Sequence, residues 1–91
     1  MTRSELCARV AARSSLSKAD VTAALGALTS TIADALAEGE TVTIAGFGKF
    51  AARTRAARQG RNPSTGEPVD IPAARVPSFK AAKTLRDALN P

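Results

Sequence analysis

The fold is decided by residues 60–66, which have the sequence Gly-Arg-Asn-Pro-Ser-Thr-Gly. Glycine, asparagine, proline and serine are all turn-forming types. From residue 51 to residue 68 the chain contains no Val, Ile, Leu, Met or aromatic residue. Such a stretch cannot anchor itself in a core, so it forms either a disordered linker or a protruding hairpin. The turn residues in its middle favour the hairpin, with its tip at about residues 60–67.

The segments on both sides of this tip have the alternation of strands. Before the tip, the period of two places Arg53 and Arg55 on one face. After it, Val69 and Ile71 alternate with other residues and predict a returning strand. The prolines that flank this strand restrict it to a sheet edge. We therefore predict a two-stranded arm, mobile until it meets a ligand, because two isolated strands are marginally stable in water.

Two helices are expected before the arm. The first, over residues 3–13, starts with a capping box formed by Thr2 and Glu5. The second, over residues 18–38, starts after the N-cap residue Ser17 and ends at Gly39. Its apolar residues recur at steps of three and four, which is typical of one helix face: Val21, Leu25, Leu28, Ile32 and Leu36.

The rest of the chain connects these parts into an α+β fold. Residues 41–44 alternate as a half-buried strand does, and a glycine-bracketed turn leads to the strand that begins at Lys49. A last helix is expected to begin at Ser78 or a neighbour, with Lys80, Lys83 and Arg86 as a basic stripe. We expect one domain over 1–91, divided into a helical base (1–45), a sheet with its arm (46–77) and the C-terminal helix (78–91).

The net charge of +5 lies entirely in the second half of the chain. Residues 1–50 carry five Lys or Arg and five Asp or Glu, whereas residues 51–91 carry eight against three. Between Lys49 and Arg61 there is no acidic residue. A basic half beside a neutral half is typical of a protein that binds a polyanion. The alternative is a solvated basic face without a partner.

The chain has few large side chains for a core, with three Phe and no Trp or Tyr in 91 residues. A small domain of this kind usually adds disulfides, a metal or a partner subunit. The only cysteine is Cys7 and there is no histidine, so we expect an obligate dimer, first of all a homodimer, with a heterodimer left open. No apolar run reaches the roughly 20 residues of a membrane span, and no signal peptide is recognisable. We therefore expect a soluble, cytoplasmic protein.

Three motifs together resemble the bacterial histone-like HU and integration host factor family, with HU the more similar. They are Gly46-Phe47-Gly48-Lys49-Phe50, Gly60-Arg61-Asn62-Pro63-Ser64-Thr65-Gly66-Glu67 and Val76-Pro77-Ser78-Phe79-Lys80. The resemblance covers essentially all 91 residues. It implies an intertwined dimer with a helical base, a β-sheet saddle and two arms that bend DNA from the minor groove. A location in the bacterial nucleoid follows from it.

The residues expected to bind DNA lie on the arm and on the body. Arm arginines can track phosphates and fit a narrow minor groove. By the resemblance, Pro63 wedges between base pairs, although on the residues alone an ordinary turn proline is the better interpretation. Gly46 and Gly48 either let the backbone approach a phosphate or form a tight turn. The expected set is Arg53, Arg55, Arg58, Arg61, Asn62, Pro63, Lys80, Lys83 and Arg86, with Arg3, Lys49, Arg75, Gly46 and Gly48 as additional candidates. The dimer core is expected to contain Phe47, Phe50, Phe79, Leu28, Ile32, Leu36 and Ile44.

Three functions are compatible with these residues. The first is sequence-tolerant architectural binding of double-stranded DNA, with a preference for nicked, kinked or flexible sites, where deformation costs less. The second is site-specific DNA bending like that of integration host factor. The third is a module that binds another polyanion, such as RNA, or an acidic protein. An enzyme is not expected, because no nucleophile–base set or metal-binding pair is visible. No cofactor, small-molecule substrate or membrane partner is expected either.

Overall fold

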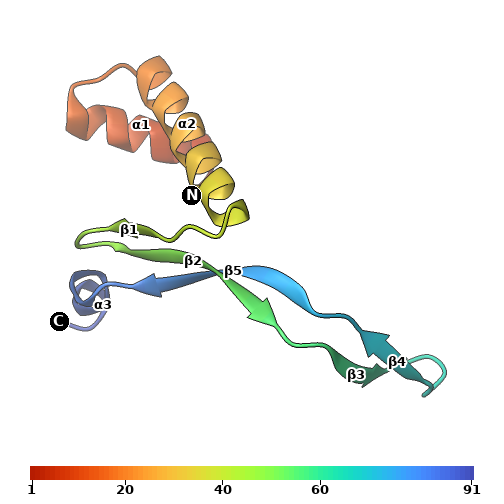
Figure 1. Ribbon diagram of the computed structural model, residues 1–91. Coiled ribbons are helices and arrows are strands. Elements are labelled where there is room, and N and C mark those ends of the chain that lie inside the picture. Colours follow the sequence, from red (N-terminus) through yellow and green to blue (C-terminus); the bar gives the residue numbers. More distant parts are fainter. The chain divides into compact units, whose positions relative to one another are not determined.

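The computed structural model describes all 91 residues, which form two compact units, Met1–Asp34 and Ala35–Pro91. The α+β class predicted from the sequence is confirmed, with three helices and five strands (Figure 1). In chain order these are α1 (Arg3–Ser14), α2 (Lys18–Ala37), β1 (Val42–Ile44), β2 (Gly48–Arg55), β3 (Arg58–Arg61), β4 (Pro68–Ile71), β5 (Ala74–Ala81) and α3 (Lys83–Leu89). None of the helices is long and apolar enough to cross a membrane.

The first unit contains α1 and most of α2, and both predicted N-caps are confirmed. The hydroxyl of Thr2 accepts a hydrogen bond from the backbone N–H of Glu5 at 3.2 Å. The hydroxyl of Ser17 accepts one from the backbone N–H of Asp20 at 3.0 Å. These bonds satisfy N–H groups that have no partner within the helix. Short-range capping chemistry therefore places the start of both helices within one residue of the prediction.

The core of this first unit is small. Cys7 and Val21 are its only buried apolar side chains. Together with half-exposed leucines and Val10 they line an apolar groove of about 460 Å³, formed by Leu6, Cys7, Val10, Leu16, Val21, Ala24, Leu25 and Leu28. Leu28 remains 48% exposed in this groove. The two helices thus leave a continuous apolar surface without a cover.

The second unit begins with the last turn of α2. The backbone N–H of Gly39 donates to the Leu36 carbonyl at 3.0 Å, and that of Glu40 donates to the Ala35 carbonyl at 2.9 Å. This pair of bonds, with Gly39 at a φ of 82°, is the Schellman arrangement that ends many helices. The predicted helix end at Gly39 is confirmed.

The strands β1, β2 and β5 form an antiparallel sheet with β2 in the centre. In its register Phe50 lies opposite Val42 on one side and opposite Phe79 on the other. The Phe79 ring lies 4.8 Å from the ring of Phe50 and 5.4 Å from that of Phe47, measured between centroids. Phe47 and Phe79 are nevertheless 44% and 45% exposed. The aromatic cluster therefore leaves much of its area without a cover, as the helical groove does.

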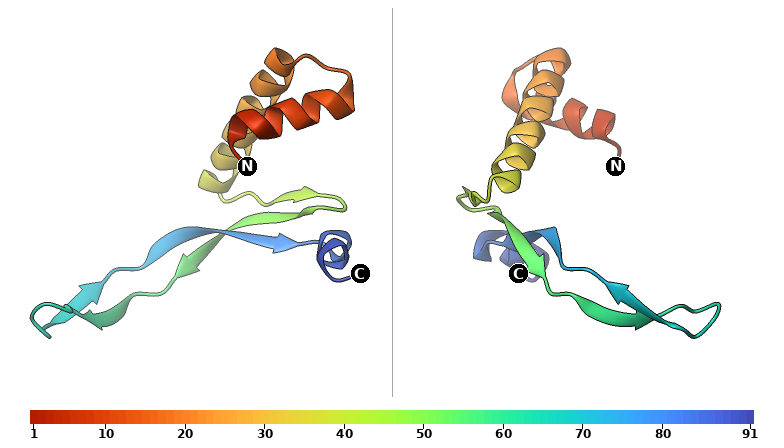
Figure 2. Two further views of the ribbon diagram at one scale, coloured as in Figure 1. Left: turned by 180° about the vertical axis from the view of Figure 1, so that it is seen from behind. Right: turned by 45° about the vertical axis from the view of Figure 1, so that its right-hand side comes forward.

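The arm predicted from the sequence is present as the hairpin of β3 and β4, which continues the hairpin of β2 and β5 (Figure 2). Its register is unbroken, because Arg55 pairs with Ala74 and Arg58 pairs with Ile71, three residues further along each strand. Strand pairing is nevertheless interrupted between these two pairs. Pro72 lies in this interval and has no backbone N–H to donate. The arm is thus one ribbon with an interruption near its base.

The predicted start of the last helix was wrong. Residues 74–81 form β5, and α3 begins only at Lys83. The reason is that the segment pairs along its whole length with β2, from Ala74 opposite Arg55 to Ala81 opposite Gly48. Pro77 is tolerated because β5 is an edge strand. The backbone N–H of Ala82 donates to the Phe47 carbonyl at 2.9 Å, which fixes the turn that precedes α3.

Candidate nucleic-acid interface

The sheet of the second unit has one basic face. The alternation of β2 places Lys49, Arg53 and Arg55 on the side opposite Phe50. The sequence predicted this shared face for Arg53 and Arg55. In the register of the sheet, Lys49 lies directly opposite Lys80. Like charges in directly opposed positions destabilise a sheet. A bound anion between them would remove this repulsion, which makes the pair a candidate site for a phosphate or another anionic group.

The end of the sheet forms a basic hollow of about 290 Å³ beside α3. Its cationic lining combines residues from two strands and a helix, namely Lys49, Lys80, Lys83 and Arg86. The sequence predicted the last three as a stripe on one helix. The structure brings them together differently, because Lys80 lies on β5 while Lys83 and Arg86 lie on α3. Lys49 joins them through the strand register.

The positive charge of this hollow is barely compensated by acidic groups. The only ion pair of the chain joins Lys83 to Asp87 at 3.8 Å, and their side chains are 83% and 61% exposed. An exposed pair of this kind contributes little to stability and does not hold Lys83 in place. Lys49, Lys80 and Arg86 form no ion pair. The hollow therefore remains available to an anionic ligand.

Exposed arginines carry the basic face along the arm. Arg53 and Arg55 extend from β2, and Arg58 and Arg61 lie at the two ends of β3. Because Arg61 is three positions after Arg58, the alternation of the strand turns them to opposite faces. The guanidinium of Arg61 also donates to the Gly66 carbonyl at 3.2 Å, across the tip. The arm thus presents cations on both of its faces.

The tip is held by its own hydrogen bonds around Asn62. The side-chain oxygen of Asn62 accepts from the backbone N–H of Ser64 at 2.9 Å. Its backbone N–H donates to the Glu67 carbonyl at 2.8 Å, and its carbonyl accepts from the N–H of Gly66 at 2.7 Å. Pro63 lies exposed at the apex of this loop. Asn62 therefore has a structural role in presenting the proline, whereas its expected contact with DNA stays a prediction.

Gly46 and Gly48 line the basic hollow, but each also has a structural explanation. Gly46 has a φ of 76°, in the left-handed region that other residues rarely adopt. At Gly48 a Cβ would collide with the ring of Phe79 and would lie 2.8 Å from the Lys80 carbonyl oxygen. A left-handed turn therefore accounts for Gly46 and close packing against Phe79 accounts for Gly48, while their approach to a phosphate stays a prediction.

The two remaining candidates from the sequence, Arg3 and Arg75, have surroundings of their own. Arg3 belongs to the first unit, where its guanidinium would lie 3.2 Å from a Cβ built on Gly26. Arg75 lies on β5 opposite Thr54, and its guanidinium donates to the carbonyls of Leu36 and Ala37. Arg75 therefore has backbone partners that the sequence did not predict.

The expected dimer-core residues are all incompletely covered within one chain. Leu28, Phe47 and Phe79 are exposed, and the other members, Phe50, Ile32, Leu36 and Ile44, are half-buried. The exposed area is compatible with a partner subunit, and their role in a dimer core stays a prediction.

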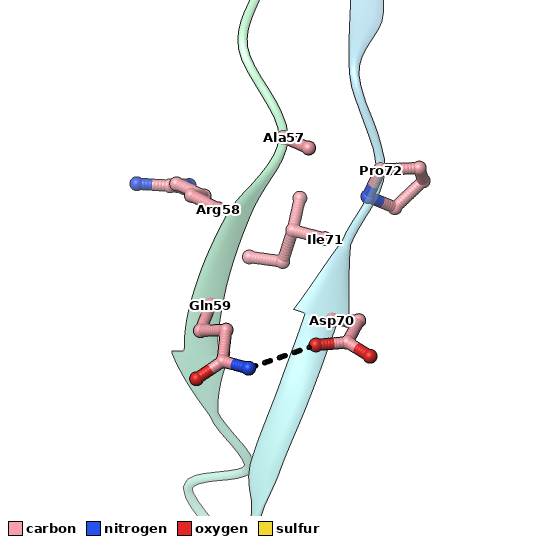
Figure 3. Close-up of a pocket in the computed structure, with 6 residues that line it drawn as sticks. All are labelled: Ala57, Arg58, Gln59, Asp70, Ile71 and Pro72. Atoms are coloured by element: carbon pink, nitrogen blue, oxygen red, sulfur yellow. Dashed lines mark hydrogen bonds between the residues drawn. The ribbon is translucent and has the colours of Figure 1, made fainter.

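Sequence reasoning missed one feature of the arm. The side-chain amide of Gln59 donates to the carboxylate of Asp70 at 3.2 Å across the two strands (Figure 3). The pair borders a hollow of about 490 Å³, lined by Ala57, Arg58, Gln59, Asp70, Ile71 and Pro72, where the strand pairing is interrupted (Figure 3). The hollow has only one cation in its lining and so lacks the charge of the basic face. No group of His, Cys, Asp or Glu in the chain could hold a metal ion.

Known proteins match this chain over its whole length. Residues 1–90 match the family described as Bacterial DNA-binding protein. DNA-binding protein HU of Geobacillus stearothermophilus is 51% identical over 89 residues, which cover 98% of this chain and 99% of that protein. DNA-binding protein HU-beta of Escherichia coli (strain K12) is 48% identical over 90 residues, which cover 99% of this chain and 100% of that protein.

Solved structures show the same fold. The cocrystal structure of Anabaena HU with DNA is similar with a TM-score of 0.96 at 45% identity, covering 100% of this chain and 99% of that chain. HU from Thermotoga maritima is similar with a TM-score of 0.68 at 32% identity, covering 98% of each chain. With a family match over 1–90 and curated relatives near 50% identity over full length, the chain belongs to the HU family of bacterial DNA-binding proteins.

Proposed function

We propose that this protein is an architectural DNA-binding protein that bends and compacts double-stranded DNA as a dimer, within the bacterial nucleoid. The observation that carries the proposal is the basic face of the sheet, where Lys49 lies directly opposite Lys80. Neither lysine has an acidic partner. The same face continues through Arg53 and Arg55 toward the arm. The matches to HU proteins, one of them solved with DNA, identify the polyanion as DNA.

The contacts of this face fit phosphates better than base edges. Lysine and arginine side chains that neutralise phosphates release condensed counterions, and this release supplies binding that does not depend on sequence. The basic hollow at α3 suits DNA that flanks the bend, because its cations converge from three elements. The arm arginines, by contrast, suit the narrow minor groove, where the negative potential is enhanced.

The arm supplies the bending in this proposal. Pro63 is an exposed apolar ring at the apex of a loop held by the hydrogen bonds of Asn62. A rigid apolar wedge inserted into a base step unstacks it partly and kinks the duplex. Arg61 lies next to this loop and can hold a phosphate beside the kink. The protein should therefore favour nicked, kinked or flexible DNA, in which unstacking is already partly achieved.

A second copy of the chain is the proposed cover for the exposed apolar surfaces. One chain buries only Cys7 and Val21 as apolar side chains, while Leu28, Phe47 and Phe79 remain between 44% and 48% exposed. Exposed apolar area of this extent marks protein interfaces in soluble proteins. We propose a homodimer, in which each subunit contributes one arm, so that DNA is contacted from two sides.

The test is the affinity for intact and nicked duplexes of the same sequence, measured at several salt concentrations. We expect a steep fall in affinity with salt, because each neutralised phosphate contributes about −0.9 to the slope of log K against log salt. We also expect tighter binding to the nicked duplex. A flat salt dependence would contradict the proposal.

Two further binding measurements separate the alternatives. Structured RNA that competes as well as duplex DNA would favour a general polyanion-binding module. Selection from a pool of random duplexes that enriches one strong motif would favour site-specific bending instead. The proposal predicts no enriched motif, because the contacts on the basic face are of the kind made to phosphates. It predicts weak competition by RNA, because an RNA helix has a wide and shallow minor groove that does not match the arms.

A further inference from the structure

Arg75 lies at the base of the arm but points away from the basic face. It pairs with Thr54 in the sheet, between the positions of Arg53 and Arg55. The alternation of β5 therefore places it on the face that carries Phe79. From there its Nη2 atom donates to the Leu36 carbonyl at 2.6 Å and to the Ala37 carbonyl at 3.1 Å. Both acceptors belong to the last turn of α2.

This helix end lacks a cation of its own. The last carbonyls of a helix have no intrahelical partner and carry partial negative charge, which a cation stabilises. The last turn of α2 contains no basic residue, and Glu38 and Glu40 follow it directly. The N–H groups of Gly39 and Glu40 satisfy the carbonyls of Leu36 and Ala35, respectively. Arg75 supplies the missing positive charge from almost 40 residues further along the chain.

The position of this contact along the ribbon gives it a mechanical consequence. Arg75 is only three residues from Pro72, next to which the strand pairing is interrupted. It therefore holds the arm-side end of β5, where pairing with β2 stops, to the end of α2. β5 is an edge strand of the sheet. Beyond that point the ribbon has no contact of this kind. A ribbon can bend a stiff duplex only if its base resists the opposing load.

We infer that Arg75 is a positioning residue, which anchors the base of the DNA-binding arm to the C-terminal turn of α2 and does not contact DNA. The inference rests on the proposed function for its consequence in bending. The anchoring contact itself is independent of DNA. Loss of the guanidinium should weaken the bend that the protein imposes while leaving the number of phosphate contacts unchanged.

The experiment compares the substitutions Arg75→Met, Arg75→Lys and, as a matched control on the basic face, Arg55→Met. Methionine keeps an unbranched apolar stem and removes the charge and all donors. The salt dependence of binding counts phosphate contacts, and fluorescence energy transfer between the ends of an intact duplex reports bending. We expect Arg75→Met to leave the salt slope unchanged and to reduce the bend, and Arg75→Lys to restore part of it. Arg55→Met should lower the magnitude of the slope by about 0.9.

Hydrogen exchange of the free protein provides a readout that does not involve DNA. Arg75→Met should accelerate exchange of the amides of Gly39 and Glu40 at least threefold, whereas Arg55→Met should leave them unchanged. A slope lowered by about 0.9 in Arg75→Met would overturn the inference, because it would place Arg75 on a phosphate. Unchanged exchange or an unchanged bend would overturn it as well. A flat slope in the unsubstituted protein would instead contradict the proposed function, and the exchange data would still decide whether Arg75 anchors α2.

Discussion

The arm and the helical unit differ in what they leave exposed to solvent. From residue 51 to residue 68 the arm has no large apolar side chain, and its exposed groups are mainly arginines and the loop around Pro63. The helical unit exposes the opposite chemistry, an apolar groove lined by residues such as Leu6, Val10 and Leu28. The apolar groove is costly in water, whereas the arginines are well hydrated and concentrate a positive charge that attracts polyanions. The comparison teaches that the two parts present different chemistry, and the proposed function assigns them different partners, DNA for the arm and a second copy of the chain for the helices.

The largest expected effect comes from placing a charge in the apolar groove. Leu28→Asp should abolish the dimer and lower its stability by more than about 3 kcal/mol, because the carboxylate would be buried without a partner. Sedimentation and thermal unfolding at several protein concentrations measure this loss. The matched control is Leu89→Asp, because Leu89 is 78% exposed and lies outside the groove. If the unsubstituted protein is a monomer, or if Leu28→Asp changes neither dimerisation nor stability, the groove is not covered by a second chain.

An intermediate effect distinguishes the packed sheet from the arm tip. Gly48→Ala should destabilise the protein by about 1–3 kcal/mol, because the added methyl group overpacks the contact with Phe79. Gly66→Ala strains a left-handed backbone position at the tip, with a φ of 73° and open space around it. The strain at residue 66 can be relieved by local opening of the tip without unpacking the sheet. Thermal unfolding should therefore show a clear loss for Gly48→Ala and little change for Gly66→Ala. Equal losses would mean that the tip and the sheet unfold as one unit, which would remove the distinction drawn between them.

The smallest expected effect comes from a substitution that stabilises the free protein but weakens its binding to DNA. Lys49→Gln removes a like-charge pair and should stabilise the free protein by about 0.5 kcal/mol. The same substitution should weaken DNA binding and lower the magnitude of the salt slope by about 0.9. Chemical denaturation and salt titration measure the two quantities on one sample. Lys18→Gln is the control, because Lys18 lies in the first unit and its ammonium donates to Ser4. A stabilised protein with unchanged DNA affinity would show that the lysine pair is no phosphate site.

Local signals in the sequence predicted most of the fold. The caps at Thr2 and Ser17 and the stop at Gly39 each depend on residues within one helical turn, so pattern and chemistry were sufficient. The arm was predicted by the absence of large apolar residues around a turn-forming tip. These features require no knowledge of distant contacts.

The parts that were missed depend on residues far apart in the chain. Residues 78–81 were expected in a helix, and they are a strand because β2 pairs with them. The opposition of Lys49 and Lys80 follows from the register of the sheet, which a single sequence does not reveal. The contact of Arg75 with Leu36 spans 39 residues. Sequence patterns identified the candidate cations, but only the register and these long-range contacts assign them to different tasks.

The most direct test of the central claim is the bend imposed on DNA by the protein with and without the Pro63 ring. Energy transfer between the ends of an intact duplex should show a strong bend with the unsubstituted protein and a much weaker one with Pro63→Ala. Binding of Pro63→Ala to a duplex that is already kinked should be nearly unchanged, because unstacking is no longer required. Equal loss of affinity on both duplexes, or an unchanged bend on the intact one, would contradict the wedge and with it the account of how the arm acts.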